Sequence, residues 1–245
     1  MRWILLCWLA AALGDEAPIR TIELKGKTHH VQGIDLYADR LWVTSVDKDA
    51  RKGYLQEFAL PSGELRRAVE VGTGVHFHAG GMARDGESLW LPVAEYRRAS
   101  SAIIQQRNSK TLELEMQYEV ADHIGCVAAG PDFVVGGNWD SRLFYVWDKK
   151  GKLLRKVENP TENGYQDLKF VDGKLVGGGL LPGKGGAVDW LEWPSLRLEK
   201  RIQAGKTDRG VPYTNEGMAA RGDRVFLLPE DGPSRLFEFR VEGRP

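Results

Sequence analysis

Histidine is the residue type in this sequence best suited to chemistry, and its positions follow a pattern. His30, His78 and His123 each stand four residues before an apolar residue that begins a strand-like segment, and His29 and His76 lie close by. Neutral imidazoles bind transition metals and also transfer protons near neutral pH. We therefore expect His30, His78 and His123 to be candidate metal ligands, and His123 also to be a candidate catalytic residue.

Carboxylates and amides occupy neighbouring positions of the same segments. Glu216 stands two residues before its apolar residue, so we predict that it is a general base or a metal ligand. Polar residues at equivalent positions, and in the loops after the following strands, are expected to bind substrate. These substrate-binding candidates are Gln32, Glu95, Asn138, Asp140, Arg142, Gln166 and Asn215.

The cofactor stays unknown at this stage. A divalent metal ion that acidifies a bound water would suit the histidines. However, the sequence has no His-Glu-x-x-His motif and no cysteine cluster. The alternative is that each histidine binds the backbone of a neighbouring repeat, and recurs only because the architecture recurs.

A repeat of 41 to 50 residues must position these side chains. Its apolar anchors are Ile34, Met82, Val127, Leu168 and Met218. A second apolar strand follows each anchor, and turn residues and two further strands complete most of the repeats. This period is typical of the four-stranded blade of a β-propeller. We therefore predict an all-β fold, a five-bladed β-propeller with polar loops gathered around one mouth of its channel.

The ends of the chain indicate how the ring closes. The fifth repeat ends after its third strand, near Val241, and an alternating segment at Ile19–Leu24 belongs to no repeat. We predict that this N-terminal strand pairs into the last blade, which would remove an exposed sheet edge. An open β-solenoid and a six-bladed ring with one degenerate blade are the alternatives.

The first residues have the pattern of an export signal. Arg2 precedes eleven uncharged residues, a run too short for a membrane-spanning helix but typical of a signal peptide. We predict a signal peptide over residues 1–14, cleaved after Gly14 or alternatively after Ala17, and a single propeller domain over residues 15–245. An uncleaved anchor is the other interpretation. Cleavage predicts a periplasmic or secreted protein with no stable membrane insertion.

The balance of charges limits the partners. The sequence has 34 Lys and Arg residues and 34 Asp and Glu residues, so no nucleic-acid partner is expected. Removal of the signal peptide leaves Cys126 as the only cysteine, which excludes an internal disulfide. We expect the ligand to be a small molecule or a peptide at the channel mouth.

Several strings in the sequence resemble known propellers. The segments His30–Ile34, Gly137–Arg142 and Pro212–Met218 resemble an uncharacterised bacterial family of secreted propeller-like proteins, over essentially the whole mature chain. More distantly, the blades resemble the five-bladed glutaminyl cyclotransferases, which form N-terminal pyroglutamate. Those enzymes carry a glutamate where this sequence has Gly80, and only Glu216 of the fifth repeat holds a glutamate in that motif position.

Two functions of different classes follow. The first is an enzyme of acyl transfer or hydrolysis, metal-assisted or cyclotransferase-like, acting on a small molecule or peptide. The alternative is a non-catalytic propeller that binds a ligand or a protein through the same rim. It would use exposed aromatic residues such as Tyr96, Trp139, Tyr165 and Tyr213.

Overall fold

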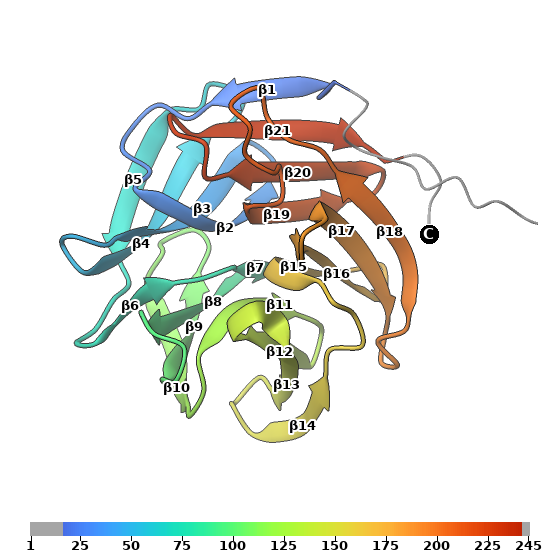
Figure 1. Ribbon diagram of the computed structural model, residues 1–245. Coiled ribbons are helices and arrows are strands. Elements are labelled where there is room, and N and C mark those ends of the chain that lie inside the picture. Colours follow the sequence, from blue (N-terminus) through green and yellow to red (C-terminus); the bar gives the residue numbers. More distant parts are fainter. Residues whose placement is uncertain (1–16, 242–245) are drawn as a thin grey trace, which may run out of the picture.

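The computed structural model describes residues 17–241, and the predicted signal peptide, residues 1–14, lies outside them. The described residues form five antiparallel β-sheets arranged as blades around a central channel (Figure 1). The predicted all-β, five-bladed propeller is therefore confirmed. Within residues 17–241, no helix has the length and apolar character needed to cross a membrane.

The blades follow one another along the chain. Blade 1 consists of β2 (His30–Tyr37), β3 (Arg40–Asp47), β4 (Lys52–Ala59) and β5 (Leu65–Glu70). Blade 2 consists of β6 (His76–Ala79), β7 (Ala83–Asp85), β8 (Ser88–Glu95), β9 (Ala102–Asn108) and β10 (Leu114–Val120). Blade 3 consists of β11 (Ile124–Ala129), β12 (Phe133–Asn138), the 3-10 turn η1 (Trp139–Ser141), β13 (Leu143–Asp148) and β14 (Leu153–Glu158). Blade 4 consists of β15 (Gly164–Val171), β16 (Lys174–Leu181), β17 (Gly185–Glu192) and β18 (Leu198–Ala204). The fifth sheet consists of β19 (Glu216–Arg221), β20 (Arg224–Pro229), β21 (Arg235–Arg240) and β1 (Arg20–Glu23).

The innermost strands lie close together around the channel, and glycine makes this possible. In blade 2 the inner strand is interrupted between β6 and β7. A Cβ atom on Gly80 would lie 2.1 Å from the carbonyl oxygen of Gly125, and one on Gly81 would lie 2.4 Å from that of Gln166. Side chains at these two positions would therefore push the inner strands apart.

The core is divided into wedges between neighbouring blades. The five repeat anchors, Ile34, Met82, Val127, Leu168 and Met218, are all fully buried. Each contributes to a hydrophobic cluster that joins its own blade to a neighbour. Each blade is thus held mainly by burial of apolar surface against the next one, which keeps the inner strand ends in fixed positions.

Strand β1 forms the outer edge of the sheet that contains the last strands of the chain. It pairs antiparallel with β21, and Ile22 lies opposite Leu236. Ile22 is buried in the cluster between this sheet and blade 1. The residues after β1 also contact blade 1, because the amide of Lys25 donates a hydrogen bond of 2.7 Å to the carbonyl of Gly63.

Candidate functional site

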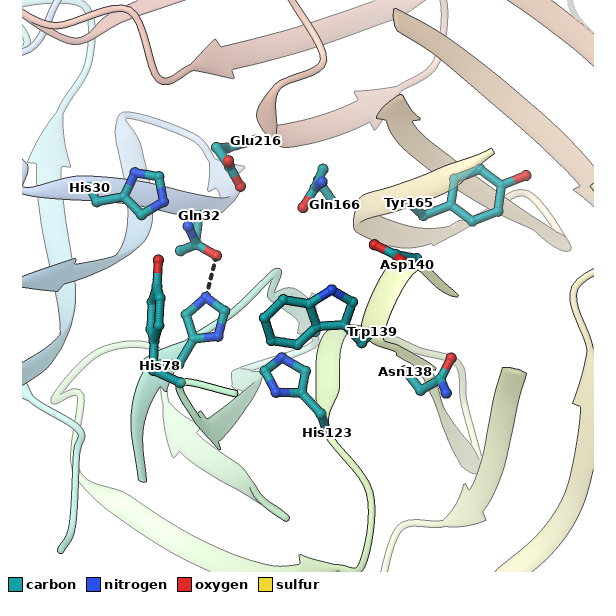
Figure 2. Close-up of a pocket in the computed structure, with 12 residues that line it drawn as sticks. His30, Gln32, His78, His123, Asn138, Trp139, Asp140, Tyr165, Gln166 and Glu216 are labelled. Atoms are coloured by element: carbon teal, nitrogen blue, oxygen red, sulfur yellow. Dashed lines mark hydrogen bonds between the residues drawn. The ribbon is translucent and has the colours of Figure 1, made fainter. Parts of the chain in front are cut away.

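A polar cavity of about 180 Å³ opens at the mouth of the channel where the innermost strands begin. Side chains from all five blades lie around it (Figure 2). The residues that line it are His30, Gln32, His78, Tyr96, His123, Gly125, Asn138, Trp139, Asp140, Tyr165, Gln166 and Glu216. Eight of the residues predicted from the sequence therefore lie at one cavity, as the repeat pattern required.

Three predicted substrate-binding residues do not line this cavity. The carboxylate of Glu95 accepts hydrogen bonds from Arg97 and Ser101, and the Arg97 side chain is the main cause that lowers its pKa to about 2. Arg142 donates to the carbonyl oxygens of Asp140, Thr161 and Asn163.

The third of these residues is Asn215, whose backbone makes the turn before β19. Its amide donates to Pro212 and its carbonyl accepts from Glu230. The Glu95 and Arg142 side chains and the Asn215 backbone are thus held by contacts within the protein. The sequence identifies the loop but not the direction of the side chain, and the substrate-binding role of these three residues stays a prediction.

Aromatic residues are the main part of the site that the catalytic interpretation did not include. The Tyr96 ring lies 4.5 Å from the His78 ring, His78 lies 5.3 Å from His123, and the Trp139 ring lies 4.5 Å from His123. These four rings form a continuous row, which we call the aromatic wall. The signal in the sequence was the placement of Tyr96 and Trp139 directly after second strands.

Two other aromatic candidates have structural roles. Figure 2 shows the Tyr165 ring pointing away from the centre of the cavity, and its hydroxyl donates a 2.8 Å hydrogen bond to Asp189. Tyr213 packs edge-on against Phe237 and Phe239 and does not line the cavity.

Glu216 has the most unusual environment in the cavity. Its side chain is buried, and it makes no hydrogen bond or ion pair among residues 17–241. Burial raises the pKa of Glu216 to about 7, while the charge of His30 lowers it and that of Glu230 raises it. A carboxyl group with this pKa exchanges a proton readily at neutral pH.

His78 is held as a neutral imidazole. The Gln32 amide nitrogen donates to the carbonyl of Val31, so its amide oxygen faces His78 and accepts a 2.9 Å hydrogen bond from His78 Nε2. Burial is the main cause that lowers the pKa of His78 to about 3. Nδ1 of His78 is then an unprotonated acceptor, and it is buried without a partner among the described residues.

His123 has the opposite tautomer. Its Nδ1 lies 3.0 Å from the carbonyl oxygen of Arg97, so Nδ1 carries the proton and donates it. Burial lowers the pKa of His123 as well. Nε2 of His123 therefore has a free lone pair in a ring that lies against Trp139. Together, His78 and His123 contribute uncharged rings with one acceptor nitrogen each.

Of the remaining polar side chains, some are hydrogen-bonded within the protein and one is available to a ligand. His30 Nδ1 lies 3.1 Å from Glu230, whose carboxylate also accepts from the amide of Val31. The Asn138 amide donates to Asp122 and accepts from Leu143. The Gln166 side chain makes no hydrogen bond among the described residues, which leaves its amide available to a ligand.

A strained turn places Trp139 and Asp140. Asp140 and Ser141 both have positive φ angles, 58° and 50°, which are unfavourable for residues other than glycine. The turn is fixed by the hydroxyl of Ser141, which donates to the carbonyl of Tyr165, and by an ion pair of 2.6 Å between Arg98 and Asp140. The guanidinium of Arg98 also lies over the Trp139 ring.

The three predicted metal ligands do not form a metal centre as they are arranged. Within residues 17–241, no three His, Cys, Asp or Glu side chains are grouped closely enough to hold an ion. His30 is bonded to Glu230, and one nitrogen each of His78 and His123 is committed to a protein carbonyl. The metal role of His30, His78 and His123 therefore stays a prediction without geometric support.

Below the cavity, Asp167 occupies the centre of the propeller. Its carboxylate accepts hydrogen bonds from the amides of Ile34, Met218 and Leu168 and from Lys169 Nζ. Lys169 in turn donates to the carbonyl of Met82. Burial raises the pKa of Asp167 to about 7, and the charge of Lys169 opposes that rise. This group, which we call the central ion pair, connects four of the five blades.

Comparison with known proteins agrees with the fold. Residues 22–165 match the model of a family described as "Family of unknown function (DUF6454)". The glutaminyl cyclase of Myxococcus xanthus has a similar structure, with a TM-score of 0.68 and 16% sequence identity over 90% of this chain and 94% of that one.

A computationally designed protein, Ika4, also matches, with a TM-score of 0.46 and 16% identity over 69% of this chain and 96% of that one. No curated protein matches the chain significantly. The predicted resemblance to an uncharacterised family and, in fold, to five-bladed glutaminyl cyclases is thus confirmed.

Proposed function

Because the chain belongs to the DUF6454 family, whose function is unknown, we propose a function from its own site: an enzyme of acyl transfer or hydrolysis in which Glu216 is the general base. The observation that carries this proposal is the Glu216 carboxyl, buried at the cavity, free of protein partners, with a pKa of about 7. The residues lining the cavity include no serine, cysteine or lysine in the described part of the chain. Proton transfer therefore suits this site better than catalysis by those nucleophiles.

The proposed step moves one proton. The Glu216 carboxylate accepts the proton of an attacking amine, hydroxyl or water as the nucleophile forms its bond to the acyl carbon. The bond to the leaving group then breaks, and the same proton passes from Glu216 to the leaving group. The Gln166 amide orients the acyl oxygen, and the aromatic wall supplies flat apolar surface that limits the access of water.

The test is a substrate screen followed by one substitution. Small esters, lactones and peptides with an N-terminal glutamine are the first substrates, the last because the similar structure is a glutaminyl cyclase. We expect Glu216→Gln to lower kcat/KM by about 10²- to 10⁴-fold. We also expect wild-type activity to rise with pH through about 7, since the unprotonated carboxyl is the active form.

A matched control makes this test specific. Glu87 lies exposed in the turn between β7 and β8, where it pairs with Lys110. Glu87→Gln makes the same chemical change away from the cavity, so its activity should equal that of the wild type. Full activity in Glu216→Gln would remove Glu216 from the mechanism.

A non-catalytic binding protein is the second candidate, and the aromatic wall favours it. Rings of Tyr96 and Trp139 flank the imidazoles, and such surfaces bind small molecules or peptide side chains without any reaction. A ligand that binds at this cavity without being converted, equally well to wild type and to Glu216→Gln, would support this candidate against the enzyme.

The metal hypothesis has a separate test. Elemental analysis of protein purified without chelators should find a stoichiometric divalent metal that His78→Ala and His123→Ala remove. Protein that is active without such a metal would end this hypothesis and leave the Glu216 proposal intact.

Strand β1 is proposed to close the propeller and so to fix the cavity. Ile22 is buried between the first and last blades, whereas Ile19 is 51% exposed. Ile22→Ala should lower the free energy of unfolding by about 2–4 kcal/mol, and Ile19→Ala should change it little. Equal effects in urea denaturation would contradict closure by β1.

Export is a further part of the proposal, supported by the apolar run after Arg2. Periplasmic or secreted material should begin at Asp15 or, after the alternative cleavage, at Pro18. Mass spectrometry of the intact protein from cell fractions tests this, and cytoplasmic protein that retains Met1 would contradict it.

A further inference from the structure

The opposite mouth of the channel holds a second recess that the proposed function does not use. A basic recess of about 290 Å³ lies where the inner strands end, lined in part by Arg84, Lys169 and Arg221. An apolar recess of about 330 Å³ lies beside it, between the first and last blades. The two recesses share Leu36, Arg221 and Phe226, and the basic recess shares no lining residue with the Glu216 cavity.

Two arginines of the basic recess have no carboxylate partner. Neither Arg84 nor Arg221 makes an ion pair within residues 17–241, although most arginines of the described chain do. The guanidinium carbons of Arg84 and Arg221 lie 4.0 Å and 5.3 Å from the Tyr37 ring, so one ring holds both cations in place. Nε of Arg84 is buried without a hydrogen-bond partner. A buried donor without an acceptor is unfavourable, and an anion would relieve it.

Of the other charged groups that line the basic recess, Asp172 is exposed in the turn after β15, whereas Asp35 and Lys169 are occupied by contacts within the protein. The carboxylate of Asp35 accepts hydrogen bonds from the amides of Leu36 and Arg84. Lys169 Nζ belongs to the central ion pair with Asp167. Arg221 gives one N–H to the carbonyl of Leu36 and retains its other donors. The two guanidiniums are therefore the groups best placed to receive a negative charge.

The apolar recess supplies a different surface. Ile22, Leu60, Phe226 and Leu236 line it. Apart from Arg221, its charged rim residues are paired with one another or with neighbours, as in the 2.7 Å ion pair between Arg20 and Glu238. Paired charges compete little for a ligand, so the recess offers mainly apolar contact.

We propose that these two recesses together bind an aliphatic carboxylate of medium chain length. The carboxylate is held by Arg84 and Arg221, because guanidinium groups match carboxylate geometry. The hydrocarbon chain passes Leu36 and Phe226 into the apolar recess. This inference is independent of the proposed function, since it uses other residues at the other mouth.

Titration calorimetry with decanoate at pH 7.5 on the full propeller tests the proposal. We expect one decanoate per chain, with tighter binding at each step from butanoate to decanoate, because longer chains bury more apolar surface. Arg221→Gln should weaken decanoate binding about tenfold, and the Arg84→Gln/Arg221→Gln double variant should weaken it further. Decyltrimethylammonium, with the same tail and opposite charge, should not bind.

Arg155→Gln is the matched control. Arg155 also donates to a backbone carbonyl, that of Pro194, and lies over an aromatic ring, that of Trp193, but on the outer edge of blade 3. Decanoate affinity should be unchanged in this variant. The single Arg221 variant, at an exposed strand end, keeps the test valid if the double variant unfolds.

Three results would overturn the proposal: no binding of decanoate, equal binding of acetate and decanoate, or affinity that the Arg221 substitution does not change. Tighter binding of inorganic phosphate than of decanoate would likewise assign the recess to a different anion.

Discussion

Two buried carboxyl groups near the channel axis, Glu216 and Asp167, show how the same chemistry serves opposite purposes. Burial raises the pKa of each to about 7. Asp167 accepts hydrogen bonds from three backbone amides and Lys169, so its charge is used to hold blades together. Glu216 has no such partner in the described chain, so its proton is free for exchange with a ligand. The number of hydrogen-bond donors, rather than burial, separates the structural carboxyl from the one that we propose as the general base.

The largest expected effect is at the structural carboxyl. Asp167→Asn would leave the Lys169 ammonium buried without a counter-charge, which should lower the free energy of unfolding by about 3–5 kcal/mol. Urea denaturation measures this. The second variant, Asp167→Asn/Lys169→Met, should recover part of the loss. A loss below about 1 kcal/mol for the single variant would mean that the central ion pair is not structural.

At Glu216 the effect of substitution on the free energy of unfolding should have the opposite sign, because Glu216→Gln should stabilise the protein. The folded pKa of Glu216 is about 7 and the ordinary value is 4.5, so folding favours the protonated form. Wild-type stability relative to Glu216→Gln should therefore fall as pH rises from about 4.5 through 7, and level off above. The variant should be more stable by about 2–3 kcal/mol at pH 8 and by little at pH 4.5. A difference that does not vary with pH would contradict this.

His78 should make a contribution to stability that depends on pH with the other sign. Its folded pKa is about 3, below the ordinary 6.5, so only the unfolded chain takes up a proton between these values. This contribution to stability is complete above pH 6.5 and decreases by about 2 kcal/mol by pH 5. Histidine NMR should show a His78 ring that stays neutral to about pH 4. Protonation near pH 6 would show that the ring is not buried as described.

The smallest expected effect is the change that His30 makes in the pKa of Glu216. The charge of His30 lowers the pKa of Glu216, so His30→Gln should move the titration midpoint of Glu216 to higher pH. Carboxyl NMR measures this midpoint. His29→Gln is the matched control, because His29 pairs with Asp47 outside the cavity. A shift to lower pH in His30→Gln would show that His30 acts on Glu216 in another way.

The fold could be predicted from the sequence because the repeat follows from the need to bury one apolar anchor in each blade. Ile34, Met82 and the other three anchors are buried at equivalent places, and this burial sets the spacing of the blades. The same logic placed Gln32, Gln166 and Glu216 at one mouth. Side-chain direction was not predictable: Arg142 turns to the carbonyls of Thr161 and Asn163, contacts that exist only after blades 3 and 4 pack.

The hydrogen-bond partners of these side chains could not be predicted from the sequence either. Asp167 and Glu216 both stand just before an anchor, and nothing in the local sequence distinguishes a carboxylate that receives four donors from one that receives none. The strained turn at Asp140 was missed for a related reason. Positive φ angles at Asp140 and Ser141 depend on the contacts of Arg98 and Tyr165 with the turn, which come from distant parts of the chain.

The central ion pair affects how ligands can pass along the channel. Asp167 and Lys169 are almost completely buried, and they lie between two cavities that share no lining residue. This buried pair therefore separates the two cavities. In the proposed reaction, substrate would reach Glu216 and product would leave it through the same opening, and the proposed ligand of the far recess would bind and dissociate independently.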